Sequence, residues 1–334
     1  MILAGDIGGT NSRIAYFQVE NGQPKMVREM VYPSREHRGL DEIVLRFIEA
    51  ETMPIEACCF GVAGPVRNGR VEASNLPWII DQASLAKELK LPSTFLINDL
   101  EANAWGISAL SENDLVLLNR VKGSPVGNRA VIAAGTGLGE AGMYWDGTKH
   151  RAFACEGGHC DFAPTNELEL DLLRYLHTRF GHVSYERIVS GPGLVNVYNF
   201  LRDTKRAQEP AWLAEEIMHS DPGAAISKAA LSGKVDLAVQ ALDLWVSIYG
   251  AEAGNLALKI LATGGVYLGG GIAPKVVSRL VGPLFMNAFV SKGRMQRLLE
   301  SMPVAVITND KTALMGAALC AAVTEREKHP VPQT

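Results

Sequence analysis

The sequence predicts an α/β protein made of two similar units, each with a mixed sheet. The first hundred residues contain three consecutive strand patterns and then alternating helix and strand patterns, an order typical of α/β domains. A strand, a turn rich in Gly and Thr, and a returning strand occur at the N-terminus and again around Gly135. The 334 residues suffice for about two domains. We therefore expect a duplicated domain that binds a ligand between its two copies.

The first unit begins with short apolar segments. Strands are expected, in chain order, over Ile2–Asp6, Ser12–Val19, Met26–Pro33, Ala57–Val62 and Thr94–Asn98. Apolar residues at helical spacing predict an amphipathic helix, and these are Leu40, Ile43, Val44, Phe47 and Ile48. Further helices are expected over Gln82–Lys90 and directly after Asp99.

The second unit starts near Ala130 and carries most of the helices. Its Gly/Thr turn lies between the expected strands Val131–Ala134 and Ala141–Trp145, and the middle of the chain, Thr165–Leu261, is mostly helical by periodicity. Near the end, the patterns predict a strand and a helix and then a loose tail, and these cover Val304–Thr308, Ala313–Val323 and Glu325–Thr334.

Composition excludes several classes of protein. Hydrophobic residues make up 47% and charged residues 20%, and the 32 basic and 36 acidic residues give a net charge of −4 without a Lys/Arg-rich run. A nucleic-acid partner is therefore not expected. The longest apolar region, Leu237–Leu261, contains Asp243, Glu252 and Lys259 and predicts a buried helix, not a membrane span. The first residues form a strand and not a secretory signal. Five cysteines without framework spacing indicate a reducing compartment, so we expect a cytoplasmic protein with no membrane partner.

The first glycine-rich turn, Gly5-Asp6-Ile7-Gly8-Gly9-Thr10, could bind phosphate. Its glycines would bring backbone N–H groups close to an anion, and Thr10 adds a hydroxyl donor. Asp6 ends a strand and could hold Mg²⁺ through water. The alternative is an ordinary hairpin turn that contains an aspartate. The turn is neither a Walker motif nor a dinucleotide fingerprint, since it lacks a Gly-Lys-Ser/Thr ending and is followed by a strand.

Two further glycine clusters support a nucleotide site. The turn Gly135-Thr136-Gly137-Leu138-Gly139 could face the same triphosphate as the first turn. Gly269-Gly270-Gly271 follows a strand pattern, where glycines would permit close approach of a base or ribose. This third cluster could equally be the break between a strand and a helix.

Asn98 and Asp99 end an apolar strand at the point where a helix begins. Ligands of open α/β sheets bind at the carboxyl ends of strands. The alternative is that one of the two residues only caps the helix, which is a frequent role of Asn and Asp.

The segment Glu156-Gly157-Gly158-His159-Cys160-Asp161 concentrates polar side chains among glycines. Carboxylates and histidine suit the adjacent hydroxyls of a sugar. A zinc site is a weaker alternative, because after Cys155, His159 and Cys160 the next cysteine is Cys320. Glu186, taken alone, is expected to be a surface helix residue.

Six ordered motifs together resemble those of the bacterial glucokinase family, within the hexokinase and actin-like ATPase superfamily. The resemblance covers nearly the whole chain. Its motifs are Gly5-Asp6-Ile7-Gly8-Gly9-Thr10-Asn11, Leu96-Ile97-Asn98-Asp99, Gly135-Thr136-Gly137-Leu138-Gly139, Glu156-Gly157-Gly158-His159, Ser184-Tyr185-Glu186-Arg187 with Ser190-Gly191-Pro192-Gly193, and Gly269-Gly270-Gly271.

This resemblance implies a fold, an activity and an assembly. The fold would consist of duplicated ribonuclease-H-like (actin-like ATPase) domains, with a mixed sheet in each and an interdomain cleft. Residues 1–107 plus about 308–328 would form a small domain, and residues 108–307 a large domain with most helices and the dimer contacts. The activity would be ATP-dependent phosphorylation of glucose at its 6-hydroxyl, giving glucose 6-phosphate. The protein would be a homodimer.

The resemblance also assigns roles to residues. Asp99 would be the catalytic base, and Asn98, Asp99, Glu156, His159 and Glu186 would bind the sugar. Mg²⁺ would lie near Asp6. ATP would be bound by residues of the three glycine clusters, namely Gly5, Asp6, Ile7, Gly8, Gly9, Thr10, Gly135, Thr136, Gly137, Gly270 and Gly271.

One departure argues against a neighbouring family. Sugar kinases and repressors that share Glu-x-Gly-His continue with a cysteine-rich zinc motif, whereas Cys160-Asp161-Phe162-Ala163-Pro164 follows here. Zinc and the repressor branch are therefore disfavoured. A kinase for mannose, fructose or an N-acetylated amino sugar stays open as an alternative. So does a sensor without catalysis, although the presence of Asp99 argues against it.

Overall fold

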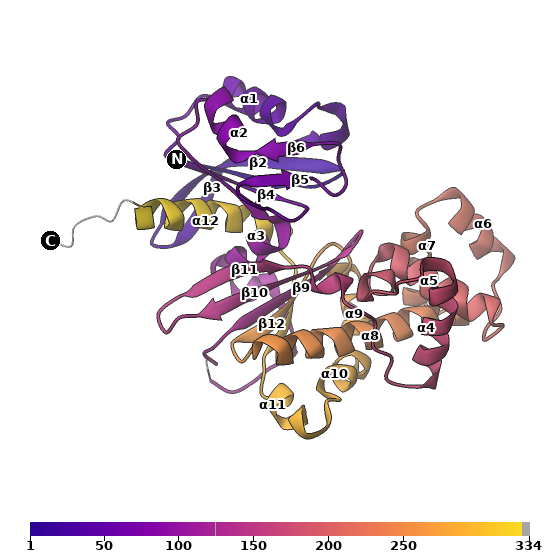
Figure 1. Ribbon diagram of the computed structural model, residues 1–334. Helices are drawn as coiled ribbons and strands as arrows, with labels where there is room; N and C mark the ends of the chain where they lie inside the picture. The colour runs from indigo at the N-terminus through magenta and orange to yellow at the C-terminus, as the bar shows by residue number, and fades with distance from the viewer. Residues whose placement is uncertain (124, 329–334) are drawn as a thin grey trace. The chain divides into compact units, whose positions relative to one another are not determined.

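The computed structural model describes residues 1–123 and 125–328 and divides into two compact units. Unit 1 comprises Met1–Asp114, Arg151–Ala154 and the chain from Asn309 onward. Unit 2 comprises Leu115–His150 and Cys155–Thr308. Figure 1 traces both units by chain position.

Unit 1 is an α/β unit with a five-stranded mixed sheet in the order β3-β2-β1-β4-β7. Strand β1 is antiparallel to β2 and parallel to β4, which is itself parallel to β7. Its elements are β1 (Ile2–Ile7), β2 (Asn11–Glu20), β3 (Gln23–Pro33), η1 (Ser34–Glu36), α1 (Leu40–Ala50), β4 (Ala57–Val62), β5 (Arg70–Glu72), β6 (Ile79–Asp81), α2 (Gln82–Glu88), β7 (Ser93–Asn98), α3 (Asp99–Gly106), η2 (Ile107–Ala109), η3 (Glu112–Asp114) and α12 (Thr312–Lys328).

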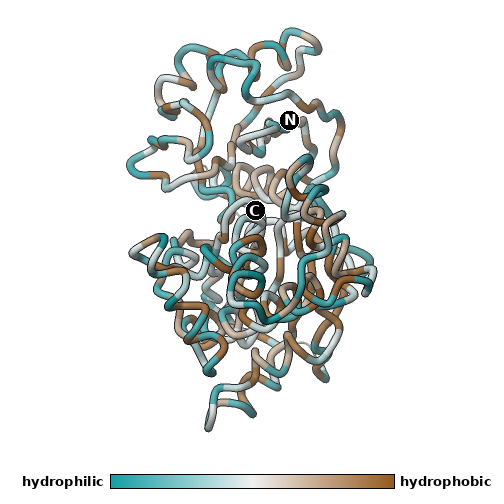
Figure 2. Tube along the Cα trace, turned by 90° about the vertical axis from the view of Figure 1, so that its right-hand side faces the viewer, coloured by the Kyte–Doolittle hydropathy of each residue, from teal (hydrophilic) through white to brown (hydrophobic). Residues whose placement is uncertain are grey.

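The sheet of unit 1 is buried on both faces. Alternate side chains of a strand point to opposite faces, and in β1 Leu3 joins the core under α1 while Ile2 and Ala4 join the core under α12. Figure 1 shows α1 and α2 on one side of this sheet and α3 and α12 on the other. Figure 2 colours the Cα trace by hydropathy, with hydrophobic residues in brown and hydrophilic residues in teal.

Helices α3 and α12 approach each other closely because glycines face backbone at their contact. A Cβ on Gly106 would lie 2.1 Å from the carbonyl oxygen of Thr312, and a Cβ on Gly316 would lie 1.8 Å from that of Ala102. Real Cβ atoms do not approach backbone so closely. Both positions therefore require glycine at the observed helix separation.

Unit 2 contains a six-stranded mixed sheet and most of the helices. The strand order is β11-β10-β9-β12-β13-β8. Its elements are β8 (Leu115–Asn119), β9 (Arg129–Ala134), β10 (Leu138–Trp145), β11 (His150–Cys155), η4 (Gly157–His159), α4 (Glu167–Phe180), η5 (Tyr185–Arg187), α5 (Gly191–Asp203), α6 (Ala211–His219), α7 (Pro222–Leu231), α8 (Asp236–Ile260), β12 (Gly265–Gly269), η6 (Ala273–Val276), α9 (Val277–Leu280), α10 (Pro283–Val290), η7 (Gly293–Met295), α11 (Gln296–Glu300) and β13 (Val304–Ile307).

The two sheets share one topology. In unit 1, β1 is antiparallel to β2 and parallel to β4. In unit 2, β9 is antiparallel to β10 and parallel to β12, so the hairpins β1/β2 and β9/β10 occupy corresponding places. Strand β8 is an addition at one edge of the second sheet, antiparallel to β13. The predicted duplication and the predicted mixed sheets are therefore confirmed.

The long apolar region of the sequence is the central helix of unit 2. Helix α8 is buried along most of its length, with Trp245 and Tyr249 fully enclosed in the core. The Tyr249 hydroxyl donates a 3.0 Å hydrogen bond to the carbonyl oxygen of Ile132 in β9. Across the residues described, no helix has the length and apolar character that a membrane crossing requires.

Some local predictions were wrong or incomplete. The tail was expected to be loose from Glu325, but α12 continues through Lys328; residues 329–334 lie outside the described part of the chain. The short strands β5, β6, β8 and β11 were not predicted. Each is short or borders the solvent, and a half-exposed strand of a few residues has little periodicity to detect.

Candidate active site

The candidate residues of unit 1 gather at one edge of its sheet. Strands β1, β4 and β7 run parallel, and their last residues Ile7, Val62 and Asn98 are register partners. The turn after β1 and the start of α3 after β7 therefore lie at the same edge. This is the edge at which α/β sheets bind ligands.

The turn from Gly8 to Thr10 is held by backbone and serine contacts. The Ser34 Oγ donates to the Gly8 carbonyl oxygen at 2.7 Å, and the Ser34 N–H donates to that of Thr10 at 2.9 Å. A Cβ on Gly9 would lie 2.6 Å from the Cβ of Asn75, so a side chain there would displace the turn. Thr10 itself is exposed, which leaves its hydroxyl available to a ligand.

Asp6 lies among other carboxylates at this edge. Burial, together with the negative charges of Asp99 and Asp310, raises the pKa of Asp6 to about 6, while Arg13 opposes this rise. Arg13 donates to the Asp310 carboxylate at 2.9 Å. A divalent cation would relieve the repulsion between Asp6 and Asp99, and carboxylate oxygens are ligands that Mg²⁺ prefers. The donor set therefore fits Mg²⁺ shared with phosphate oxygens.

Asn98 and Asp99 divide two roles between them. Asn98 is the N-cap of α3: its Oδ1 accepts from the N–H of Leu100 at 2.9 Å and of Glu101 at 3.4 Å, and its Nδ2 donates to the Gly64 carbonyl oxygen at 3.1 Å. Asp99 is the first residue of the helix and its Oδ1 also accepts from the Leu100 N–H, at 3.0 Å, while its side chain stays partly exposed.

The second and third glycine clusters come together in unit 2. The Gly191 N–H donates to the Gly135 carbonyl oxygen at 2.9 Å, and the Ile272 N–H donates to that of Ala134 at 3.2 Å. Gly270 has φ +80°, and a Cβ there would lie 2.3 Å from the Ala134 carbonyl oxygen. A Cβ on Gly135 or Gly271 would meet no atom within 4 Å. The two clusters thus pack against each other at Gly270, while the Cβ positions of Gly135 and Gly271 face open space.

Two helix N-termini adjoin the second glycine turn. Ser190 caps α5, accepting from the Gly193 N–H at 2.9 Å, and Asp221 caps α7, accepting from the Ala224 N–H at 2.9 Å. A Cβ on Gly223 would lie 3.2 Å from the Gly191 carbonyl oxygen, so the two N-termini are neighbours. Sequence reasoning missed the α7 N-terminus, although Asp221-Pro222 is a readable helix start.

Three of the predicted sugar ligands lie in neighbouring short helices of unit 2. Glu156 and His159 are exposed, with 4.0 Å between the Glu156 Oε2 and the His159 Nε2. Glu186 lies in η5, which is joined to the end of η4 by a 3.1 Å hydrogen bond from the Tyr185 N–H to the Cys160 carbonyl oxygen. The structure therefore places these side chains in one region of the unit.

Glu186 was expected, from the sequence alone, to be a surface helix residue, and this was wrong. Its Oε2 accepts from the Leu138 N–H at 3.0 Å, and a Cβ on Gly137 would lie 2.4 Å from the same oxygen. Glu186 thus contacts the second glycine turn directly. The contact spans distant parts of the chain, so local periodicity carries no signal for it.

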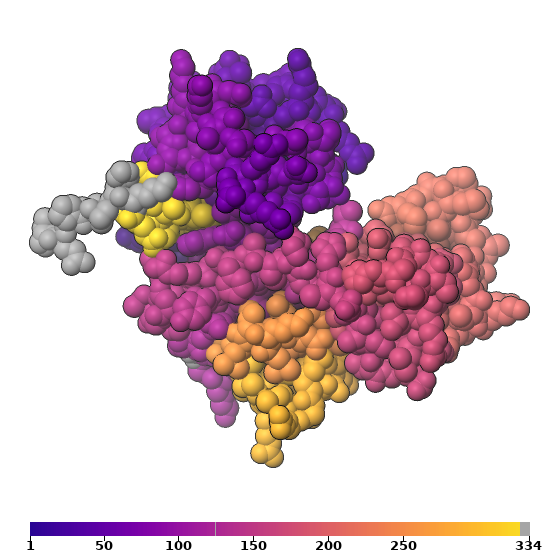
Figure 3. Space-filling view, viewed as in Figure 1, coloured from indigo at the N-terminus to yellow at the C-terminus, as the bar shows by residue number. Residues whose placement is uncertain are grey.

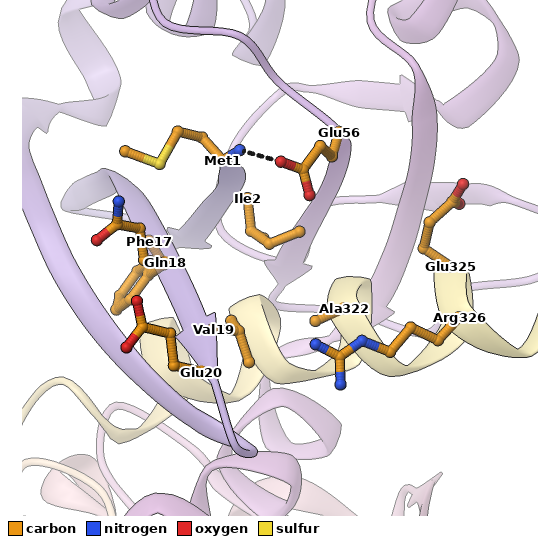
Figure 4. A pocket seen from close by; sticks show the side chains of 10 residues that line it. All are labelled: Met1, Ile2, Phe17, Gln18, Val19, Glu20, Glu56, Ala322, Glu325 and Arg326. Carbon is orange, nitrogen blue, oxygen red and sulfur yellow. Dashed lines mark hydrogen bonds and ion pairs between the residues drawn. The ribbon is translucent and has the colours of Figure 1, made fainter. Parts of the chain in front are cut away.

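A surface pocket of about 290 Å³ lies away from these residues. Figure 4 shows Met1 and Ile2, at the start of β1, and Ala322 and Arg326, on α12, around it. The Met1 ammonium group and Glu56 form a 2.8 Å ion pair at its rim. The pocket is at the amino end of β1, whereas the candidate residues follow the carboxyl end.

Within the described residues, no three His, Cys, Asp or Glu side chains form a group that could hold a metal ion. His159 pairs with Glu156, and Cys155 and Cys160 are free thiols. All five cysteines are free.

Known proteins resemble this chain over almost its full length. The glucokinase family model matches residues 3–324. A glucokinase of Nostoc sp. is 43% identical over 96% of this chain and 99% of its own. A glucokinase of Synechocystis sp. is 40% identical over 96% of this chain and 97% of its own.

Solved structures match the fold. The crystal structure of a glucokinase from an Antarctic psychrotroph superimposes with a TM-score of 0.84 at 29% identity, covering 96% of this chain and 98% of the other. A ROK family glucokinase from Streptomyces griseus, in complex with glucose and AMPPNP, superimposes with a TM-score of 0.64 at 22% identity, covering 96% and 99%. The second likeness concerns the fold alone.

Proposed function

This chain belongs to the glucokinase family and phosphorylates glucose with ATP, and we propose that Asp99 is the base that takes the proton from the sugar 6-hydroxyl. The observation that carries this proposal is the division of roles at the start of α3. Asn98 is the N-cap of the helix, while the neighbouring Asp99 accepts from the shared Leu100 N–H and presents a partly exposed carboxylate at the ligand-binding edge of the sheet. The product would be glucose 6-phosphate.

In this reaction the protein forms no covalent bond to either substrate, and it takes part in one proton transfer. The 6-hydroxyl oxygen forms a bond to the γ-phosphorus, the bond from that phosphorus to the β-bridging oxygen breaks, and the hydroxyl proton moves to Asp99. Catalysis then depends on positioning and on stabilising the charge of the transferred group.

Asp6 would hold Mg²⁺ through water, close to the first glycine turn. Bound there, the ion would neutralise charge on the ATP phosphates. The crowding of Asp6 and Asp99 supports this assignment, because it leaves negative charge at this edge that Arg13 only partly balances.

ATP phosphates would contact the exposed hydroxyls and open backbone of the two Gly/Thr turns. Thr10 and Thr136 are both exposed. Gly270 and Gly271 would approach the ribose or base, which is supported by the open space beside Gly135 and Gly271.

The sugar hydroxyls would be bound by Asn98, Asp99, Glu156, His159 and Glu186. The exposure of Glu156 and His159 supports this role, since neither side chain is enclosed by the protein. Asn98 has fewer free hydrogen-bonding groups than the other proposed sugar ligands. Its Oδ1 already accepts twice and its Nδ2 donates once, so we assign it a single N–H donor toward the sugar.

We also propose that the enzyme works in the cytoplasm as a homodimer. The five free cysteines support a reducing compartment. Exposed Trp212 and Met218 on α6, the helix in salmon in Figure 3, support a contact surface on unit 2. Light scattering coupled to gel filtration measures the assembly directly, and a monomer at micromolar concentration would contradict the dimer.

The Asp99→Asn variant tests the proposed base. The amide has nearly the shape of the carboxylate but cannot take up the proton, and general-base catalysis typically contributes about 10²- to 10⁴-fold, or roughly 3–5 kcal/mol in the barrier. We expect kcat to fall by at least about 100-fold, while glucose binding measured by calorimetry stays within about tenfold.

A role for Asp99 in helix structure alone predicts a different result. Asn and Asp are similarly good at helix N-termini, so turnover would then stay within a few-fold of the parent. That outcome would remove Asp99 from the chemistry. Asn98→Asp is the matched control, since it should keep the cap and reduce turnover less than Asp99→Asn does.

A further inference from the structure

Two buried glutamates of unit 2 have no place in the mechanism above. Glu140 in β10 and Glu252 in α8 are both almost completely inaccessible to solvent. Carboxylates are rarely buried without a specific partner, because removing a charge from water is costly. The arrangement around the pair indicates what it does.

The two carboxyl groups lie close enough to form a hydrogen bond with each other. Two ionised carboxylates can only accept, so one of the pair must carry a proton. Glu252 already accepts from Asn255 Nδ2 at 2.8 Å and from Lys259 Nζ at 3.3 Å. The Oε1 of Glu140, in contrast, has no hydrogen-bond partner among the described residues. Glu252 is therefore the member paired with a cation, and Glu140, whose Oε1 has no partner among the described residues, is the member that carries the proton.

The charges nearby balance without Glu140. The other titratable groups facing the pair are Tyr249 and Lys259 of α8, Tyr185 of η5, Cys155 at the end of β11, and Lys292 after α10 together with the Glu169 that it faces. Lys259 forms a 3.3 Å ion pair with Glu252, and Lys292 faces both Glu252 and Glu169. An ionised Glu140 would share Lys259 with Glu252 and would have no ion pair of its own among the described residues.

The carboxyl group of Glu140 lies directly under the turn that carries two of the proposed sugar ligands. A Cβ on Gly157 would be 1.8 Å from the Glu140 Oε2, and a Cβ on Gly158 would be 1.9 Å from the Leu138 carbonyl oxygen. The backbone between Glu156 and His159 thus rests on β10, with the Glu140 side chain as part of the supporting surface.

We propose that Glu140 is a positioning residue for glucose: as a neutral acid that donates to Glu252 it supports the Gly157–Gly158 turn, and its ionisation weakens sugar binding. This rests on the proposed roles of Glu156 and His159 as sugar ligands. When Glu140 loses its proton to the solvent, a second negative charge appears beside Glu252 and the hydrogen bond between them is lost. The turn above then loses its support.

The pH range follows from the surroundings of Glu140. Burial and the charge of Glu252 raise the pKa of Glu140 to about 8, with Lys259 opposing. If only the neutral form holds the turn, the apparent glucose KM is the intrinsic value divided by the neutral fraction, so it roughly doubles at about pH 8 and rises about tenfold by about pH 9. The ATP KM should not follow this rise.

The test compares the glucose KM of the parent and of Glu140→Gln from neutral pH to about pH 9. Gln keeps the shape and a donor to Glu252 but cannot ionise. Its glucose KM should stay within about threefold of the parent at neutral pH and remain flat as pH rises. Glu140→Ala removes the support at every pH and should raise the glucose KM even at neutral pH. The infrared band of a protonated carboxylic acid at neutral pH should be present in the parent and reduced in Glu140→Gln.

An alkaline rise that persists in Glu140→Gln, or a parent glucose KM that stays flat, would overturn the proposal. Cys160→Ser is the matched control, because thiols ordinarily ionise near pH 8.5; it should keep the rise of the parent, and loss of the rise would assign it to the thiol instead. Glu156→Ala at neutral pH distinguishes a failure of the proposed sugar ligands from a failure of the proposed role of Glu140. If it leaves the glucose KM unchanged, the sugar assignment itself fails; if it raises the KM while the parent profile is flat, only the role of Glu140 fails.

Discussion

At the scale of single residues, several side chains of this enzyme serve the fold and the ligand together. Asn98 caps α3 with its oxygen, which leaves part of its amide for the sugar that we propose it binds. Glu186 accepts from the Leu138 N–H of the second glycine turn, so a proposed sugar ligand also shapes a proposed phosphate-binding turn. Substitutions at such residues need to separate the two roles.

Glu186→Gln should separate them. The amide oxygen of Gln can still accept from the Leu138 N–H, while the charged acceptor for sugar hydroxyls is lost. A lost hydrogen bond to a buried partner costs roughly 1–3 kcal/mol, so we expect the glucose KM to rise by about 5- to 150-fold with the ATP KM changed by less than about threefold. Steady-state kinetics with each substrate varied in turn provides the measurement.

Glu186→Ala should behave differently, because it also removes the contact with Gly137 and Leu138. Both KM values should then rise. Glu215→Gln, at an exposed position on α6, is the control and should change neither. Equal effects of Glu186→Gln on both substrates would reject its assignment to the sugar.

At the scale of elements, close packing of helices places the catalytic edge of unit 1. Helix α3 carries Asp99 at its first position, and its other end contacts α12 through Gly106. Helix α12 in turn covers the sheet through small residues such as Ala317 and Ala321. The separation between α3 and α12 therefore determines where α3 begins relative to β7.

Gly316→Ala tests this packing. The added methyl group would lie 1.8 Å from the Ala102 carbonyl oxygen, so the helices must separate. Overpacking typically costs about 1–3 kcal/mol, and the better helix propensity of Ala recovers about 1 kcal/mol. We expect a net loss of at least about 1 kcal/mol in the free energy of unfolding, measured by urea denaturation, and a lower kcat because α3 moves.

Gly39→Ala is the control for this substitution. Its Cβ would meet only the Asp41 carboxylate, the end of a side chain that can rotate away. It should cost less than Gly316→Ala and leave kcat unchanged. A Gly316→Ala variant as stable as the parent would show that α3 and α12 can separate freely.

At the scale of the whole molecule, the chain repeats one sheet topology twice, and in our proposal each copy serves different chemistry. The turn after β1 and the turn after β9 occupy the same place in the two sheets. In unit 1 this edge also carries Asp6 and Asp99, and in unit 2 the neighbouring short helices carry Glu156 and Glu186. Duplication supplied two similar glycine turns, and the residues around them diverged.

We expect the enzyme to contain no bound zinc. Cys160 is followed by Asp161 and not by the cysteines of a zinc motif, and His159 faces Glu156. Active protein dialysed against a chelator should contain far less than one zinc per chain by elemental analysis. One tightly bound zinc per chain, with activity lost when it is removed, would contradict this expectation.

Much of the fold could be predicted because its signals are local. Apolar periodicity located the main strands and the buried helix α8, and the paired glycine turns predicted the duplication. The candidate turns were found for the same reason: a tight turn near an anion needs glycine whatever the rest of the chain does. Short edge strands such as β8 and β11 were not predicted, because exposure to solvent on one side weakens their apolar periodicity.

The sequence by itself determined most of the strands and helices and the positions of the glycine turns, and it supplied the candidate motifs for the chemistry. Only the tertiary structure decided the partners: Asn98 and not Asp99 as the cap, Glu186 against Leu138, and Glu140 against Glu252. The physical reason is that periodicity reports which face of an element is buried but not what covers it. Sheet order and helix packing bring distant residues together, and they are set by the whole chain at once.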